Sequence, residues 1–283
     1  MILIADGGST KCDWALVDEN TELYIKTDGM NPYFASSEQI EHIIKKQLLR
    51  KLPKDSITQI DRVCFFGAGC REDKSDYLKD NLQKWLPKAE ISVEGDMKGA
   101  ALALLGRERG IACILGTGSA SCLYDGIQIV EFAQSLGYIL GDEGSGATMG
   151  KTLVADYFKY QMPEPIRGKF FKKYKLTPQA LNEAVYRGAT PNRFLASFAP
   201  FLSKNIAEPY IYNLVFDSFM DFMGRNITQY TDFQQEKISF CGSIAYYFSD
   251  VLEVVVGEFG MEIGKIIKSP IAGMVEFFRT NKL

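Results

Sequence analysis

The chain has 283 residues, of which 46% are hydrophobic and 24% are charged, and its formal net charge is −3. This length allows two domains with sizeable cores, and the composition is that of an ordinary globular protein. Because the slightly acidic balance supplies no basic face to neutralise phosphates, we do not expect nucleic acid as a partner.

The first ten residues, MILIADGGST, contain no basic segment, and no later apolar run is long enough to span a bilayer. We therefore expect a cytoplasmic protein with no membrane partner. The six cysteines form no C-x-x-C pair, and most lie in apolar stretches with a strand-like pattern. Such residues are expected to be buried reduced thiols: Cys12, Cys64, Cys70, Cys113, Cys122 and Cys241.

In the first part of the chain, strand patterns are followed by alternating helices and strands. The opening three strands are predicted to form an antiparallel meander. Alternation after the meander predicts parallel pairing, helices on both faces of the sheet and ligands at the carboxyl ends of the strands. The expected strands are 1–6, 12–18, 22–29, 62–69 and 90–96, and the expected helices are 37–51, 74–86 and 97–108.

The chain has one histidine, His42, within the expected helix 37–51. Ser36 and Gln39 have the spacing of a capping box, and His42 lies beside an apolar stripe, so we interpret it as an ordinary surface residue. A Ser-His-Asp triad and a multi-histidine metal site are therefore not expected. Any acid-base chemistry is assigned to a carboxylate.

The strand pattern begins again at residue 110, which suggests an internal duplication. Gly118-Ser119 followed by Cys122 repeats Gly8-Ser9 followed by Cys12. Residues 145–235 are expected to be a mostly helical insertion in the second half, and no low-complexity linker separates the halves. Strand 237–245, helix 246–258, strand 265–270 and helix 271–280 complete the expected order.

Two glycine-rich hairpins are candidates for binding phosphate. In IADGGSTK, a strand ends in Asp6 and is followed by Gly8, Ser9, Thr10 and Lys11, whose N–H groups, hydroxyls and ammonium could face phosphates. Asp6 would then hold Mg²⁺ through water. The alternative is that the glycines only close a hairpin.

The second hairpin, LGTGSAS, places Thr117 and Gly118 at the equivalent point of the second half. Two such hairpins could hold the phosphates of one nucleotide between them. Neither stretch is a P-loop or a dinucleotide fingerprint, because the spacing of the glycines differs.

Three further positions carry candidate functional groups. Asp96 ends a predicted strand and begins a helix, where it could instead be an N-cap. Asp142 and Glu143 lie in GYILGDEGSG, where they could instead be acids of a first helical turn. Gly242-Ser243 follows a strand and could let the backbone approach an adenine or a ribose.

Together these motifs resemble the N-acetylglucosamine kinase and BadF/BadG/BcrA/BcrD ATPase family, within the sugar kinase, heat-shock protein 70 and actin superfamily. The resemblance covers nearly the whole chain. It is carried by DGGSTKCDWALVD, GDMKGA, ILGTGSAS, GYILGDEGSGATMGK, SFCGSIA and KIIKSPIAGM, in that order. The most specific element is G-D-E-G-S after G-T-G-S.

The resemblance implies an α/β protein of two ribonuclease-H-like, actin-like ATPase domains, with nucleotide and sugar in an interdomain cleft. The domains would be 1–110 plus 268–283, and 111–267 with the helical insertion. The last helix would return to pack on the first domain. The family's ligands would be ATP, Mg²⁺ and a sugar, and the resemblance leaves a homodimer open.

Several positions match functional residues of the family. Thr10 and Thr117 match phosphate-contacting threonines, and Asp6 matches the position used around magnesium. Gly242 falls in the adenosine motif. Asp96 matches the catalytic aspartate, and the sugar would be bound by Asn31, Asp96, Ser135, Leu136, Gly137 and Asp142. Glu143 would support the turn.

The chain departs from the animal N-acetylglucosamine kinases at two positions of the sugar pocket. Leu136 stands where they have tryptophan, and Ala120 where they have asparagine. The resemblance therefore predicts phosphate binding more firmly than it predicts the identity of the sugar.

The activity implied by the resemblance is ATP-dependent phosphorylation of an amino sugar, expected at the 6-hydroxyl of N-acetylglucosamine, with Asp96 accepting the hydroxyl proton. Two alternatives remain at this point. One is an activator of a 2-hydroxyacyl-CoA dehydratase, which would need exposed cysteines to hold an iron–sulfur cluster between subunits. The other is a sugar or nucleotide sensor without catalytic activity.

Overall fold

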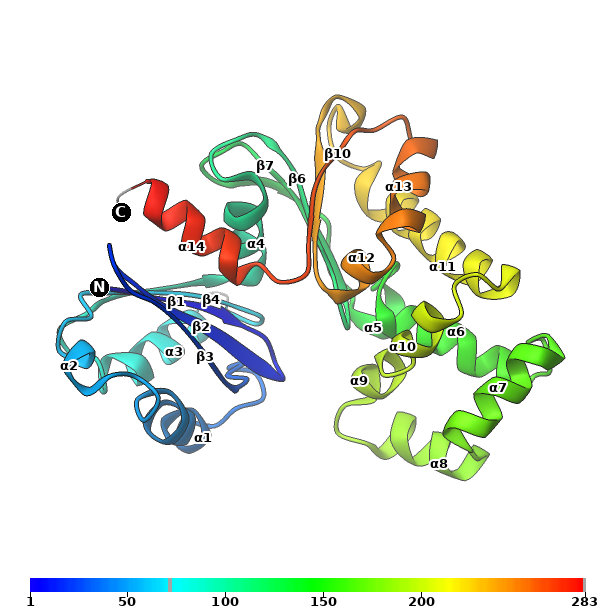
Figure 1. The fold of residues 1–283 in the computed structure, drawn as a ribbon, viewed down its shortest axis with the longest axis horizontal. Helices are drawn as coiled ribbons and strands as arrows, with labels where there is room; N and C mark the ends of the chain where they lie inside the picture. Colours follow the sequence, from blue (N-terminus) through cyan, green and yellow to red (C-terminus); the bar gives the residue numbers. More distant parts are fainter. Residues whose placement is uncertain (71–72, 282–283) are drawn as a thin grey trace. The chain divides into compact units, whose positions relative to one another are not determined.

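The computed structural model describes residues 1–70 and 73–281 and divides into two compact units (Figure 1). Unit 1 comprises residues 1–107 and 269–283, and unit 2 comprises residues 108–268. The sequence had placed these divisions after residues 110 and 267. Residues 282 and 283, at the end of the segment predicted to return to the first domain, lie outside the described residues.

Unit 1 contains a five-stranded sheet in the order β3-β2-β1-β4-β5. Strands β1, β2 and β3 pair antiparallel, and β1, β4 and β5 pair parallel. This confirms the predicted meander and the predicted parallel pairing. The strands are β1 (Ile2–Gly7), β2 (Lys11–Val17), β3 (Glu22–Asp28), β4 (Arg62–Gly67) and β5 (Glu90–Gly95).

Helices cover both faces of this sheet. Leu3 and Trp14 belong to a core that includes Ile40 and Leu78 from the helices of one face. Ile4 is fully buried on the other face, where α14 contacts β1, β2 and α4. A strand covered on both faces is expected to be apolar on both sides, as β1 is from Ile2 to Ala5. The helices of unit 1 are α1 (Ser37–His42), its π-helical continuation η1 (Ile43–Leu48), α2 (Lys54–Ile57), α3 (Asp73–Gln83), α4 (Asp96–Leu105) and α14 (Ile271–Thr280).

Unit 2 contains a sheet in the order β10-β9-β6-β7-β8, which repeats the order of unit 1. Again three antiparallel strands are followed by parallel ones, so the predicted duplication is confirmed at the level of topology. The strands are β6 (Gly110–Leu115), β7 (Ser119–Tyr124), β8 (Ile129–Phe132), β9 (Ile238–Cys241) and β10 (Ile263–Ile267).

The Gly-Ser…Cys repeat that suggested this duplication is out of register in the structure. Cys12 lies opposite Gly7, in the pair that closes the first hairpin. Cys122 lies opposite Ala112, three pairs beyond the closing pair of Leu115 and Ser119. The first hairpin has four residues between its closing partners and the second has three. The two cysteines of the repeat therefore lie at different distances from the closing pair of their hairpins.

The insertion of unit 2 is helical, as predicted. The expected helix 246–258 is instead two helices, α12 and α13, with a break at Phe248. The helices of unit 2 are α5 (Gly137–Leu140), α6 (Gly146–Phe158), α7 (Glu164–Tyr174), α8 (Pro178–Asn182), η2 (Glu183–Arg187), α9 (Pro191–Ala196), α10 (Ala199–Lys204), α11 (Pro209–Phe222), η3 (Met223–Ile227), η4 (Phe233–Gln235), α12 (Ser243–Tyr247) and α13 (Ser249–Glu258).

All six cysteines are free and buried, which confirms their interpretation as reduced thiols. Within residues 1–70 and 73–281, none of the helices is both long enough and apolar enough to cross a membrane.

Candidate active site

In unit 1, three parallel strands end in glycines that lie side by side. Gly7 pairs with Gly67, and Gly67 pairs with Gly95. A Cβ atom on Gly7 or Gly67 would lie 2.4 Å from a ring atom of Phe65, so no larger residue fits without displacing that ring. Asp6 precedes the first of these glycines and Asp96 follows the last, which puts both carboxylates at the carboxyl edge of the sheet.

The turn between β1 and β2 is closed by the Gly8 N–H, which donates to the Lys11 carbonyl at 2.9 Å. Ser9 and Thr10 are exposed at its tip. Gly29, which the sequence analysis missed, supports the turn from behind. Its N–H donates to the Thr10 carbonyl at 3.0 Å, and a Cβ there would lie 2.4 Å from the Gly8 carbonyl oxygen.

Negative charge is concentrated around Asp6. Burial, followed by the charges of Asp13 and Asp96, raises the pKa of Asp6 from its ordinary value to about 7, while Lys11 opposes the rise. The Lys11 ammonium lies 2.6 Å from an oxygen of the buried Asp13, which lies opposite Asp6 in the sheet. No group of three or more His, Cys, Asp or Glu side chains in the described chain is placed to ligate a metal directly. Asp6 therefore fits a cation held through water better than one it ligates directly.

Asp96 is the first residue of α4, and Gly95 is the N-cap. The interpretation of Asp96 as an N-cap is therefore wrong. One carboxylate oxygen accepts the N–H of Met97 at 3.0 Å, which fixes the side chain at the start of the helix. Asp96 is only partly buried, so its carboxylate is accessible from outside the sheet.

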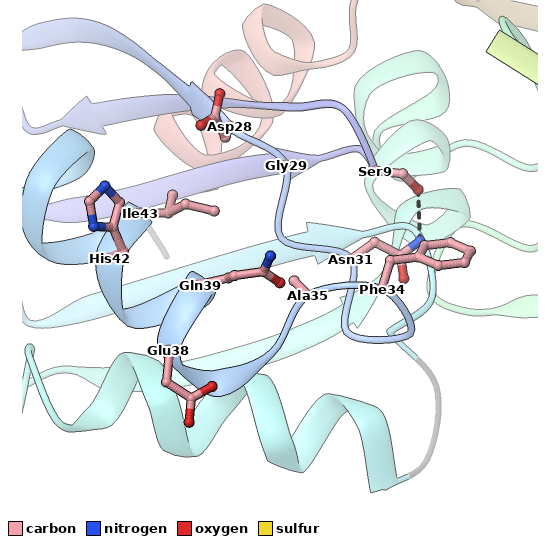
Figure 2. A pocket seen from close by; sticks show the side chains of 10 residues that line it. All are labelled: Ser9, Asp28, Gly29, Asn31, Phe34, Ala35, Glu38, Gln39, His42 and Ile43. Atoms are coloured by element: carbon pink, nitrogen blue, oxygen red, sulfur yellow. Dashed lines mark hydrogen bonds between the residues drawn. The ribbon is translucent and has the colours of Figure 1, made fainter. Parts of the chain in front are cut away.

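Asn31 is buried beside the first hairpin. Its Nδ2 donates to Ser9 Oγ at 2.7 Å, and its Oδ1 accepts the N–H of Tyr33 at 3.0 Å. An amide has two N–H donors and two lone pairs, so one of each remains for a ligand. A cavity of about 540 Å³ opens beside this contact (Figure 2), lined by Ser9, Asp28, Gly29, Asn31, Phe34, Ala35, Glu38, Gln39, His42 and Ile43. His42, predicted to be an ordinary surface residue, thus borders a cavity.

In unit 2, the hairpin at residues 116–118 is bonded to the start of α6. The Gly146 N–H donates to the Gly116 carbonyl at 2.9 Å, and the Ala147 N–H donates to the Thr117 carbonyl at 3.1 Å. The Thr117 side chain remains exposed. The second hairpin and the GDEGSG segment therefore form one hydrogen-bonded body.

Asp142 adopts the left-handed conformation, with φ of 57°, which is uncommon outside glycine. Its Oδ1 accepts the Ser119 N–H at 3.3 Å, and a Cβ on Gly118 would lie 2.9 Å from its Oδ2. Burial raises the pKa of Asp142, and the Ser119 hydrogen bond partly offsets this. Because α6 begins at Gly146 with Ser145 as its N-cap, Asp142 and Glu143 are not acids of its first turn.

Glu143 holds the segment to the helical insertion. It accepts a hydrogen bond from Asn226 Nδ2 at 3.3 Å and lies 3.8 Å from the Arg225 guanidinium. These contacts support the interpretation that Glu143 stabilises the turn.

The short helix α5 begins at Gly137, with Leu136 as its N-cap and Ser135 just before it. Ser135 is exposed, and Leu136 is 56% exposed. A Cβ on Gly141 would lie 3.2 Å from the Leu136 Cβ, so Leu136 packs directly against the residue before Asp142. These positions lie in the same loop region as Asp142.

Gly242 lies against the second hairpin, with φ of 119° and a virtual Cβ only 2.1 Å from the Leu115 carbonyl oxygen. Ser243, the next residue, lines a cavity of about 430 Å³ together with Gly116 and Thr117. The sequence analysis missed the rest of this lining, which comes from the insertion and from α12 and its end: Ala196, Ser197, Ala199, Pro200, Ser203, Lys204, Ile244, Tyr247 and Phe248.

Two α/β units with the same strand order, each with a glycine-rich hairpin after its first strand, form a fold that is shared with solved structures of sugar kinases. No protein-family model matches the chain. A candidate N-acetylglucosamine kinase from Porphyromonas gingivalis has a solved structure that is 41% identical, with 100% of both chains covered and a TM-score of 0.95. The chain therefore belongs to the N-acetylglucosamine kinase family.

Two more distant proteins are also similar, one in sequence and one in fold. The N-acetylmuramic acid/N-acetylglucosamine kinase of Clostridium acetobutylicum is 25% identical over 219 residues, which are 73% of this chain and 69% of that protein. A candidate N-acetylglucosamine kinase from Chromobacterium violaceum shares the fold, with 18% identity, 98% of each chain covered and a TM-score of 0.74.

Proposed function

We propose that this protein transfers the terminal phosphoryl group of ATP to a hydroxyl of an amino sugar, and that the reaction is at the 6-hydroxyl of N-acetylglucosamine. The observation that carries the proposal is the 41% identity to a candidate N-acetylglucosamine kinase over the full length of both chains. The alternative of a dehydratase activator has no support among the relatives.

Each unit carries residues that are proposed to bind the nucleotide. In unit 2, the 430 Å³ cavity between Thr117 and Ser243 has the size of a small-molecule site and would take adenosine. The exposed tips of the two hairpins, with Thr10 and Thr117, would donate to the phosphates. The backbone would approach the nucleotide at Gly8, Ser9, Gly118 and Gly242. The ammonium group of Lys11 would approach its phosphates.

Asp6 would hold Mg²⁺ through water. Its raised pKa of about 7 reports a site where negative charge is unfavourable, which a divalent cation would relieve. Bound there, Mg²⁺ would neutralise charge on the transferring phosphates. Lys11, now paired with Asp13, would add a second positive charge if it turned to the phosphates.

Asp96 would accept the proton of the sugar hydroxyl. The Met97 N–H holds one of its oxygens at 3.0 Å, which orients the carboxylate without burying it. Asn31 and Asp142 would bind other sugar hydroxyls, because each carries an amide or carboxylate held by a backbone N–H. Ser135, Leu136 and Gly137 would border the sugar.

The proposed partners are the sugar and ATP, in a cytoplasmic homodimer. An activator of the dehydratase type would need exposed thiols, whereas all six cysteines are buried.

A coupled ADP-release assay tests the proposal. N-acetylglucosamine, N-acetylmannosamine, glucosamine and glucose would each be supplied with ATP and Mg²⁺, and the phosphorylated position would be read by NMR. We expect the highest kcat/KM for N-acetylglucosamine, with phosphate on O6. Sugar binding without any ADP release would instead identify a sensor.

A further inference from the structure

The cavity beside Asn31 is lined by one residue of the proposed sugar site, Asn31, and not by the proposed base. It shares Ser9 and Asn31 with the first hairpin and the proposed sugar site, whereas Asp96 is not among its lining residues. Its volume of about 540 Å³ can hold a monosaccharide substituent with room to spare. A sugar bound through Asn31, with its reacting hydroxyl at Asp96, would direct other substituents into this cavity.

Two acidic residues are among those that line the cavity (Figure 2). Asp28, at the end of β3, accepts a hydrogen bond from Gln47 Nε2 at 2.7 Å. Glu38, in the first turn of α1, accepts from Ser36 Oγ at 2.7 Å, which lowers its pKa and keeps it ionised. His42 carries the only basic nitrogen among the described lining side chains, and no lysine or arginine is among them.

The remaining wall is apolar. Phe34, Ala35 and Ile43 line it, and the Phe34 ring is 81% exposed (Figure 2). An exposed ring beside a hydrogen-bonding amide suits a neutral group with a methyl end, since the methyl can lie on the ring. A carboxylate there would lose hydration and meet two like charges.

Resting on the proposed kinase function, we propose that this cavity restricts the acceptor to N-acetylhexosamines with neutral substituents and rejects sugars that carry a carboxylate. N-acetylmuramic acid, whose lactyl ether bears a carboxylate at O3, is such a sugar. The Clostridium acetobutylicum relative is named for both N-acetylmuramic acid and N-acetylglucosamine. This chain discriminates between them through the charges of Asp28 and Glu38.

The experiment measures kcat/KM for both sugars with the full-length wild-type protein and two charge-reversal variants. Glu38→Lys places a positive charge in the cavity wall. Glu41→Lys is the matched control, because Glu41 is an exposed glutamate of the same helix that does not line the cavity. Each protein is assayed at about 0.05 M and about 0.5 M KCl, because salt screens exposed charges.

We expect the wild type to prefer N-acetylglucosamine by about tenfold or more, with a smaller preference at high salt. Glu38→Lys should reduce this preference at least about threefold by lowering KM for N-acetylmuramic acid, and Glu41→Lys should leave it unchanged. Asp28→Asn is a second variant, expected to reduce the preference in the same direction.

Equal use of both sugars by the wild type overturns the inference while leaving the kinase function standing. Equal effects of Glu38→Lys and Glu41→Lys also overturn it. They would show that the preference depends on the overall charge of the helix and not on a residue that lines the cavity. Absence of phosphorylation of any amino sugar would instead contradict the proposed function.

Discussion

At the residue scale, acidic side chains lie close together at the carboxyl edge of the sheet in unit 1. Asp6 lies opposite Asp13 in the sheet, and both Asp13 and Asp96 raise its pKa. Such an arrangement is unfavourable in an empty protein and favourable when a cation and a phosphate chain are bound. Catalytic sites commonly contain charged groups whose arrangement lowers the stability of the protein without its ligands.

Asp96→Asn removes the proposed base while keeping the shape of the side chain and its place at the start of α4. Because a positioned base contributes typically about 10²- to 10⁴-fold, we expect a loss of kcat in this range. Binding of ATP and sugar, measured by calorimetry, should remain. Glu94→Gln, two residues earlier and exposed, should keep full turnover. Wild-type kcat in Asp96→Asn would contradict the role as a base.

Asp6→Asn should stabilise the ligand-free protein, and more so at high pH. The folded-state pKa of Asp6 is about 7, above the ordinary aspartate value of 3.8. As pH rises from about 4 to 7, the unfolded state loses this proton first, so the wild type loses stability until the folded pKa is passed. Over the whole shift of about 3 units the loss approaches 4 kcal/mol.

Urea unfolding in EDTA at pH 5 and pH 8 measures this effect. The stabilisation by Asp6→Asn should be larger at pH 8 by about 2 kcal/mol, since most of the titration lies between these values. Asp18→Asn is the contrast, because hydrogen bonds from Asn20 and Thr21 lower the pKa of Asp18. That variant should lose stability on the alkaline side.

At the element scale, the site depends on glycines where backbones meet. Gly29 supports the first hairpin and Gly242 supports the second, each with a virtual Cβ within 2.4 Å of a carbonyl oxygen. Both supports come from segments remote in sequence from the hairpins. The hairpin conformation is therefore fixed by tertiary contact as well as by its own residues.

Gly242→Ala should destabilise unit 2 severely. The added Cβ would lie 2.1 Å from the Leu115 carbonyl oxygen at a φ of 119°, so backbone strain and steric displacement combine to about 3 kcal/mol or more. Gly257→Ala is the matched control, in the last turn of α13 with nothing within 4 Å of its virtual Cβ. It should stabilise by up to about 1 kcal/mol. Chemical denaturation distinguishes the two.

Local patterns predicted most elements, because buried strands and amphipathic helices have clear periodicities. They failed where tertiary structure decides. Phe248 interrupts an apparently continuous helix. The Ser197–Lys204 side of the 430 Å³ cavity carries no motif, since it reaches Thr117 and Ser243 only through packing of the insertion. The carboxylates of Asp6 and Asp96 were predictable because strand ends and glycine turns mark them.

At the scale of the whole molecule, each unit has its own hydrophobic core and its own candidate ligand-binding residues. Hydrogen exchange should separate them. Adenosine, which lacks phosphates, should slow exchange at residues 116–118 and 196–204 of unit 2 and leave 29–38 of unit 1 unchanged. If adenosine alone slowed hydrogen exchange at residues 29–38, the proposed nucleoside site in unit 2 would be wrong. N-acetylglucosamine should protect 29–38.

The return of α14 to unit 1 has a consequence for biosynthesis. Its buried residues Ile271, Met274, Val275 and Phe278 face the first unit, and a Cβ on Gly273 would lie 2.6 Å from the Ala103 carbonyl oxygen. The ribosome makes this helix only after all of unit 2. Unit 2 can therefore complete its core before unit 1 does. Until α14 is made, unit 1 has an uncovered apolar face that a nascent-chain chaperone could recognise.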